Sequence, residues 1–307
     1  MSMRIPTKAL LVILLSAALA LPAVASVQGS FERTLTVTGP VDLEVLTHSG
    51  DITVRSGPAG TVSIRGKIIV GNGWFSGNRQ ADVSALEKNP PIRQSGNNIR
   101  IDYVNVQNIA IDYEITVPAD SNLRTHSGSG DQTIEGLNTK VELESGSGDL
   151  RLASLSGGFR VHTGSGNVNG RDISGPITAE AGSGDLQLEV KGSGDVSVHT
   201  GSGNIDLRDL KGALRAEAGS GDISIAGVQT GGWEVRTGSG DIQLRLPSEA
   251  AFDLEASTGS GSLVVDRPIT TTIQGNVRRI HHNISGKVAG GGPPLTVHTG
   301  SGDVHIY

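Results

Sequence analysis

The feature that most constrains this chain is a short turn, G-S-G-D or G-S-G-N, that recurs at nearly constant spacing. Between residues 128 and 241, successive Asp or Asn positions of the turn are separated by 18, 18, 18, 19, 18 and 19 residues. Such a period indicates stacked coils, in which each repeat buries its apolar face against its neighbours. The seven copies are Gly128–Asp131, Gly146–Asp149, Gly164–Asn167, Gly182–Asp185, Gly201–Asn204, Gly219–Asp222 and Gly238–Asp241, and a further copy is Gly300–Asp303.

The residues between the turns alternate between apolar and polar. Each turn is followed by an apolar-polar-apolar triplet, such as Leu150–Leu152, and a second triplet begins nine residues later at Phe159. A period of two is typical of a half-buried strand. The sequence therefore predicts an all-β fold, namely a parallel β-solenoid (β-helix) with coils of 18–19 residues and two short strands per coil.

Histidine and glutamate alternate at the outward position just before successive turns. In-register parallel stacking places equivalent residues about 4.8 Å apart, so each basic or titratable residue would lie between carboxylates. We interpret this column as structural charge pairing, which is worth roughly a few tenths of a kcal/mol per pair. A metal ladder fails on geometry, because like residues lie about 9.6 Å apart and ligands of one ion lie about 2 Å from it. The column consists of His126, Glu144, His162, Glu180, His199, Glu217 and Arg236.

The first 25 residues have the parts of a secretory signal. Arg4 and Lys8 precede a short apolar run, and Ala23–Ala25 supplies the A-x-A pattern. We expect cleavage after Ala25, which leaves residues 26–307 as a single exported domain in the periplasm, at the cell surface or secreted. The apolar run is short for a membrane span and no later stretch approaches that length, so no span is expected in the mature chain.

Composition argues against several classes of function. Removing the signal changes the net charge from -6 to -8, with 23 Lys and Arg against 31 Asp and Glu, and nucleic-acid binding needs clustered Lys and Arg. The absence of cysteine excludes disulfides, thiolate metal sites and a cysteine nucleophile. No Ser-His-Asp order, phosphate loop or metal-ligand spacing occurs, and the acids keep the register of the repeat. The sequence therefore predicts neither an enzyme nor a cofactor.

Calcium is the alternative to a cofactor-free repeat. β-Rolls built from G-G-x-G-x-D-x-U-x repeats bind Ca²⁺ between stacked turns, and the turns here share the glycine, the aspartate and the following apolar residue. They lack the residue between Gly and Asp, and Asn replaces Asp at Asn167 and Asn204. Neutral ligands lower the negative charge that the ion needs.

The repeat is interrupted between the first predicted β coils, residues 26–70, and the main array, residues 99–307. Residues 71–98 are predicted to form a loop and a short helix over Gln80–Lys88 that packs on the open end or flank of the solenoid, because exposed strand edges invite aggregation. Trp74 and Phe75 lie on the glycine-flanked loop. We interpret them as an apolar cap or, alternatively, as a contact site for a glycan or protein.

Three features together carry a resemblance to a known family: the exported N-terminus, the strand motif Y-x-I-x-V-P at Tyr113–Pro118 with Asn89–Ile92 ahead of it, and the repeated turns. The chain resembles the "putative adhesin" family of bacterial β-strand-repeat proteins, DUF4097, from about residue 30 to its end. The resemblance implies a cell-envelope solenoid without known catalytic residues.

This resemblance favours an adhesin-like binding or scaffold module for a glycan or an envelope protein. Two alternatives remain open at this point. The first is a structural solenoid that associates end to end through the terminal strand Val304–Tyr307. The second is a calcium-binding protein like a β-roll.

Overall fold

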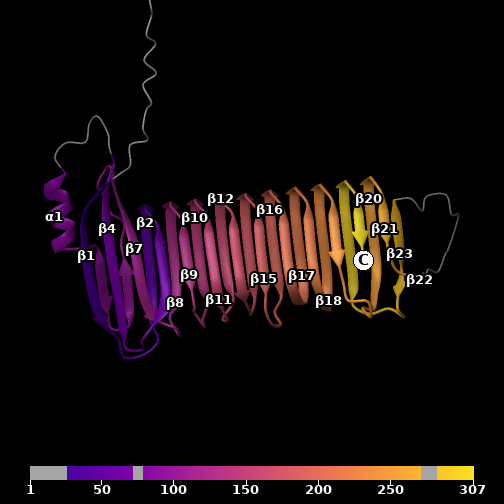
Figure 1. Cartoon of the computed structure of the whole chain (residues 1–307), viewed down its shortest axis with the longest axis horizontal. Coiled ribbons are helices and arrows are strands. Elements are labelled where there is room, and N and C mark those ends of the chain that lie inside the picture. Colours follow the sequence, from indigo (N-terminus) through magenta and orange to yellow (C-terminus); the bar gives the residue numbers. More distant parts are fainter. Residues whose placement is uncertain (1–25, 72–78, 271–281) are drawn as a thin grey trace, which may run out of the picture.

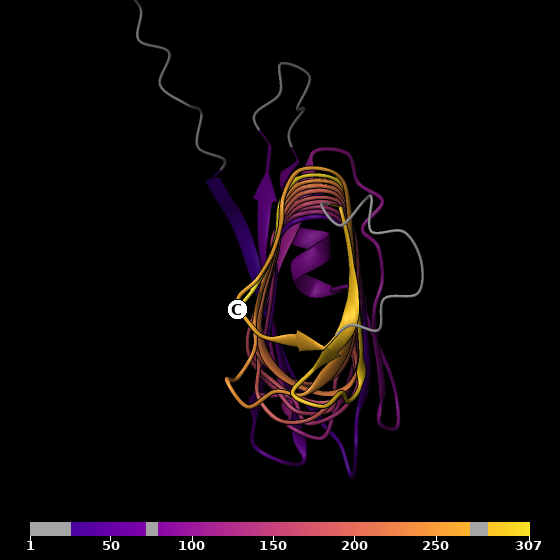
Figure 2. The same cartoon turned by 90° about the vertical axis from the view of Figure 1, so that its right-hand side faces the viewer.

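The structure, a computed structural model, describes residues 26–71, 79–270 and 282–307. These residues form a long and largely parallel β-solenoid with one short helix in the described part. Figure 1 shows the strands side by side along a straight rod, and Figure 2 shows the rod end-on as a flattened oval. The predicted all-β solenoid is thereby confirmed. None of the helical segments in the described ranges has the length and hydropathy of a membrane span.

Each coil contributes one strand to each of two faces. The first, which we call the ladder face, follows the pairing order β5 (Ile92–Ser95), β6 (Asn98–Ile101), β2 (Asp42–Ser49), β8 (Asn122–Ser129), β10 (Val141–Ser147), β12 (Phe159–Ser165), β14 (Ile177–Ser183), β16 (Val196–Ser202), the second halves of β17 (Ile205–Ser220) and β18 (Ile223–Ser239), β24 (Pro294–Ser301), β20 (Phe252–Ser260), β23 (Asn283–Val288) and β22 (Ile269–Thr270).

The second face, called the opposite face, runs along the other side of the oval. Its pairing order is β1 (Ser26–Thr36), β4 (Thr61–Val70), β7 (Ile109–Pro118), β3 (Ile52–Gly57), β9 (Gln132–Glu135), β11 (Leu150–Leu155), β13 (Val168–Ile173), β15 (Leu186–Val190), the first halves of β17 and β18, β19 (Ile242–Arg245), β25 (Val304–Ile306) and β21 (Leu263–Val265).

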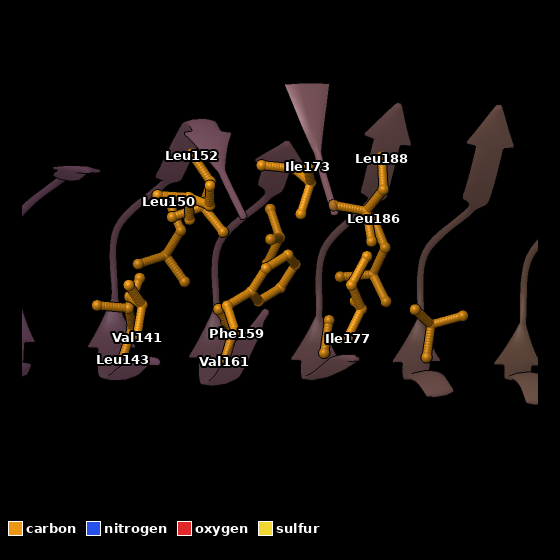
Figure 3. Close-up of a cluster of buried hydrophobic side chains, with 14 of the residues drawn as sticks. Val141, Leu143, Leu150, Leu152, Phe159, Val161, Ile173, Ile177, Leu186 and Leu188 are labelled. Carbon is orange, nitrogen blue, oxygen red and sulfur yellow. The ribbon is translucent and has the colours of Figure 1, made fainter. Parts of the chain in front are cut away.

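The core is a thin apolar layer between the two faces. Register pairing puts Val141, Phe159 and Ile177 in one inward column of the ladder face, and all three are buried. Leu150 and Leu186 approach them from the opposite face (Figure 3). Because side chains alternate along a strand, the same period of two that buries these residues sends their neighbours outward to solvent.

Two coils, one near each end of the rod, are inserted between coils that lie elsewhere in the sequence. The coil of β2 and β3 lies between the coil of β6 and β7 and that of β8 and β9. Likewise, β24 and β25 lie between β18–β19 and β20–β21. The expectation that the terminal strand Val304–Tyr307 lies at the end of the rod is therefore wrong, because β25 is paired along both of its edges.

Antiparallel strands lie on both faces at the N-terminal end of the rod and on the ladder face at its other end. At the N-terminal end β4 pairs antiparallel with both β7 and β1, so of the strands over residues 26–70 only β2 and β3 belong to the parallel coils. At the other end β23 pairs antiparallel with β20 and β22. An antiparallel strand runs opposite to the strands of the coils and has a different hydrogen-bond pattern, so it does not continue the parallel repeat.

The helix α1 (Gln80–Lys88) has the bounds predicted from the sequence and packs on the N-terminal end, where Figure 2 shows it across the oval. Val83 is buried, and the Glu87 carboxylate accepts a hydrogen bond of 3.0 Å from the Ser30 backbone N–H. Arg33 donates to the carbonyl oxygens of Glu87 and Lys88, at the helix C-terminus. These contacts fasten the helix over strand β1.

Candidate functional site

The repeated turns stack so closely that glycine is required in them. Gly184 has a φ of +140°, and a Cβ atom on it would lie 2.1 Å from the carbonyl oxygen of Gly166 in the preceding coil. A Cβ atom on Gly182 would lie 2.6 Å from the carbonyl oxygen of Gly164, which is also too close. Only a residue without a side chain combines this backbone conformation with this approach. The glycines of the turn are thus explained by stacking.

The Asp or Asn that ends each turn caps the coil next to it. The side-chain Oδ1 of Asp149 accepts the backbone N–H of Asn167 at 3.0 Å. Asn167 accepts that of Asp185 at 2.9 Å, and Asp185 that of Asn204 at 2.8 Å. An amide oxygen and a carboxylate oxygen serve equally in this role, which explains why Asn replaces Asp at two positions.

The series of capping contacts, called the Asx ladder, runs nearly the whole length of the rod, from Asp112 and Asp51 to Asp303 and Ser262. Along it the Arg151 guanidinium, hydrogen-bonded to Asp131, lowers the pKa of that carboxyl below its usual value. Within the described ranges, no group of three or more His, Asp or Glu side chains is placed to hold a metal ion.

The column of histidines and glutamates forms a second ladder. Strand register places all seven residues in one outward column, which continues from Arg236 to His298. Glu234, rather than Glu217, receives the Arg236 guanidinium at 2.7 Å. Histidine Nδ1 and glutamate Oε2 atoms are separated by 2.8, 3.5 and 3.9 Å in the pairs His126–Glu144, His162–Glu180 and His199–Glu217.

A further charged column lies beside it on the ladder face. Arg124 pairs with Glu142 at 2.8 Å, and Arg215 pairs with Glu234 at 2.6 Å, in each case one coil apart. The chain order does not reveal the N-terminal part of this column, because Glu44 is separated by 80 residues from Arg124 but lies directly opposite it in the register. The ladder face is therefore lined with charges that compensate one another.

A concavity of the ladder face, called the hairpin hollow, lies at its N-terminal end. It has a volume of about 750 Å³ and forms where the β5–β6 hairpin extends the sheet beside β2, β8 and β10. Cationic side chains from four strands or loops meet there with carboxylates. The charged residues that define it are Arg93, Arg100, Arg124, Lys140, Asp42, Glu44 and Glu142.

Most of these charges are already paired. Arg93 and Arg100 both contact Asp102, at 2.5 and 2.8 Å. The Glu142 carboxylate receives Lys140 and Arg124, which lower its pKa below the usual value despite partial burial. The hollow is thus a polar surface with fixed geometry rather than a catalytic arrangement of unpaired acids or bases.

An aromatic pair lies near Arg100 and Glu44, two of the residues that line the hairpin hollow. The ring of Tyr103 stacks on that of His48 with centroids 4.4 Å apart, and it meets His126 edge-on at 6.2 Å. Burial raises the pKa of the Tyr103 hydroxyl, and Glu144 raises it further. Sequence reasoning missed Tyr103, because its loop reaches the ladder face only through the threading of β2. Trp74 and Phe75, the predicted aromatic contacts, lie outside the described residues.

The parallel stack defines a β-solenoid with two faces, and comparison with known families is consistent with that class. The family model described as Toastrack DUF4097 matches residues 1–200 and 193–307, so the chain belongs to this family.

Among solved structures, the chain is similar in fold to a putative adhesin from Bacteroides fragilis, with 15% identity, 91% of this chain and 98% of that chain covered and a TM-score of 0.36. It is also similar to a putative adhesin from Parabacteroides distasonis, with 9% identity, 72% of this chain and 94% of that chain covered and a TM-score of 0.38. A third similar structure is a putative cell adhesion protein from Clostridium sporogenes, with 11% identity, 90% of this chain and 98% of that chain covered and a TM-score of 0.26. No curated protein matches the chain.

Proposed function

We propose that the protein is an exported, non-catalytic module of the cell envelope that binds a partner at the hairpin hollow, in the manner of an adhesin or scaffold. The observation that carries this proposal is the position of the hollow. It lies where the β5–β6 hairpin interrupts the repeat and adds Arg93 and Arg100 beside the stacked charges of β2, β8 and β10, and a rigid rod holds it at one end. Loops and irregular segments on rigid scaffolds commonly carry binding residues.

A protein surface is the partner that this chemistry favours. Arginine and tyrosine are enriched at protein interfaces, and here Arg93, Arg100 and Arg124 line the hollow, with Tyr103 near Arg100. Arg93 is 77% exposed, so it is free to exchange its present carboxylate for one on a partner. Complementary charges of this kind steer association and select partners.

A glycan is the second candidate, and Tyr103 favours it. Sugars stack on aromatic rings, and the ring of Tyr103 lies next to the polar lining of the hollow. Trp74 and Phe75 stay a separate proposed contact for a glycan or protein, outside the described residues.

Export rests on the signal-like first 25 residues and is tested by fractionation. The cells are separated into cytoplasmic, periplasmic, membrane and secreted fractions, and the N-terminus of the mature protein is sequenced. We expect Ser26 as the first residue and an extracytoplasmic location. Recovery of the intact chain in the cytoplasm would rule export out.

Binding is tested by affinity capture from envelope extracts. In the variant Arg93→Ala, Lys140→Ala, Asp102 keeps Arg100 and Glu142 keeps Arg124, so no carboxylate loses its last partner. The matched control, Arg236→Ala, Lys287→Ala, removes two exposed cations at the other end of the rod. We expect the first variant to lose capture of a specific partner and the control variant to retain it. Equal capture by both variants would refute it.

A further inference from the structure

The opposite face carries a second concavity, called the bulge hollow, midway along the rod. It has a volume of about 400 Å³ and crosses strands β9, β11, β13, β15 and β17. At its centre the backbone is irregular: Gly170 stands in register where the neighbouring coils have Leu152 and Leu188, and a register shift follows between Gly170 and Ile173. Bulges redirect side chains and are frequent next to functional sites.

The polar side chains around the bulge hollow differ from those of the hairpin hollow because several lack partners. Asn169, Gln187, Arg171 and Thr133 make no side-chain hydrogen bond or salt bridge with any residue that the structure describes, and Glu189 interacts with Arg208 through charge alone. Asn169 and Gln187 are directly opposite one another in register, so two planar amides repeat one coil apart. The hollow therefore presents free donors and acceptors together.

The charge of the bulge hollow identifies the ligand class. Its cations are Arg151, Arg171 and Arg208, and three acids, among them Glu189 and Asp206, balance them. The mature chain is acidic overall, so the surface does not attract polyanions. A ligand rich in hydroxyl groups fits, because each hydroxyl both donates and accepts hydrogen bonds. No aromatic side chain is among the residues that line the hollow, so a ligand there is held by hydrogen bonds and not by ring stacking.

We propose that the bulge hollow binds a neutral glycan chain laid along the rod axis. Equivalent side chains recur about every 4.8 Å along that axis, a step similar to the advance of one sugar unit in an extended chain. In this arrangement Arg171 and the two amides donate to sugar oxygens, and Glu189 accepts from sugar hydroxyls. Because recognition relies on a few hydrogen bonds, we expect weak binding, with a Kd of about 1 mM or somewhat tighter.

The site is independent of the proposed function, since it lies on the other face of the rod. Residues 26–307 are titrated with cellohexaose, maltohexaose and chitohexaose, and with an oligogalacturonate as the charged comparison, by saturation-transfer NMR and calorimetry. We expect at least one neutral hexasaccharide to bind and the oligogalacturonate to bind more weakly. Failure of all three neutral probes, or preference for the oligogalacturonate, would overturn the glycan site but leave partner capture at the hairpin hollow unaffected.

Matched variants locate the binding. We expect Gln187→Ala to weaken it about threefold and Arg171→Ala about tenfold, as for the loss of a neutral and of a charged hydrogen bond. Gln243→Ala removes an amide from the same outward column two coils beyond Asp206, and Arg160→Ala removes an unpaired guanidinium from the ladder face. Both controls should bind as the wild type does. Unchanged affinity in both test variants would contradict the proposed location.

Discussion

At the scale of single residues, two buried threonines in the inward column before the turns differ in whether their hydroxyl groups are hydrogen-bonded. Thr163 and Thr200 occupy equivalent positions two coils apart, with Ala181 between them, and both are fully buried. The Thr200 hydroxyl donates to the carbonyl oxygen of Gly184 at 3.1 Å. The Thr163 hydroxyl finds no acceptor among the described residues. A buried hydroxyl without a partner costs free energy that a methyl group of the same shape does not.

This difference predicts opposite results for the same substitution. Thr200→Val should lower the free energy of unfolding by about 1 kcal/mol, because it removes a hydrogen bond and leaves an acceptor bare. Thr163→Val should leave it unchanged or raise it by up to about 1 kcal/mol, because nothing is lost except the cost of the bare hydroxyl. Urea unfolding of residues 26–307, monitored by circular dichroism, measures both, and equal destabilisation by the two variants would contradict the assigned contacts.

The Glu142 carboxylate, whose side chain is 24% exposed, predicts how stability depends on pH. Lys140 and then Arg124 hold its pKa below the usual 4.5. A carboxyl whose pKa is lower in the folded state stabilises the fold above 4.5 and loses that contribution as the pH falls through the folded value. Glu142→Gln should therefore reduce the drop in melting temperature between pH 6 and pH 3. Glu255→Gln, at an exposed carboxylate without a salt bridge, controls for the loss of one charge. A drop as large as that of the wild type would contradict the pairing.

At the scale of elements, variants of the Asx ladder can show whether the turn needs a hydrogen-bond acceptor or a negative charge. Asp185→Asn keeps the side-chain oxygen that accepts the Asn204 backbone N–H, whereas Asp185→Ala removes it. We expect the alanine variant to lose about 1 kcal/mol, as for the loss of a helix cap, and the asparagine variant to lose nothing. Thermal melting at neutral pH compares the two. Equal losses would show that the carboxylate charge, rather than the acceptor, is what the turn uses.

The elements that sequence analysis predicted correctly are those whose signal is local. The triplet Leu150–Leu152 and the helix Gln80–Lys88 follow from residues close together in the chain. The position of β24 does not follow from local sequence, because its apolar triplet would fit on any coil. The repeat period also does not indicate which coils are neighbours. The same threading at the N-terminal end sets β2 between β6 and β8, and with it the hairpin hollow and the approach of Tyr103. Those features depend on contacts across dozens of residues.

At the scale of the whole molecule, the inserted coils hold the last coils of the rod in place. The coil of β24 and β25 lies between β18–β19 and β20–β21, so β20 and β21 are joined to the rest of the rod through it. In a solenoid each coil is stabilised only by the coils that it touches. Loss of an internal coil therefore detaches everything beyond it.

Deletion of residues 294–307 tests this arrangement. We expect hydrogen-exchange protection to disappear from β20 and β21, which lose their only parallel neighbours, while β10, β12 and β14 keep theirs. Full protection of β20 in the deletion variant would contradict the threaded order. The exposed edges should also promote aggregation, which light scattering detects.

The most direct test is photo-crosslinking in the living cell, because the central claim is that the repeat builds the rod and an envelope partner binds where the β5–β6 hairpin interrupts it. A photoreactive amino acid replaces Arg93 in the hairpin hollow or, in a parallel strain, Arg236 within the repeat. We predict a discrete envelope adduct from position 93 and none from position 236. An adduct from position 236 alone, or from neither position, would contradict the claim.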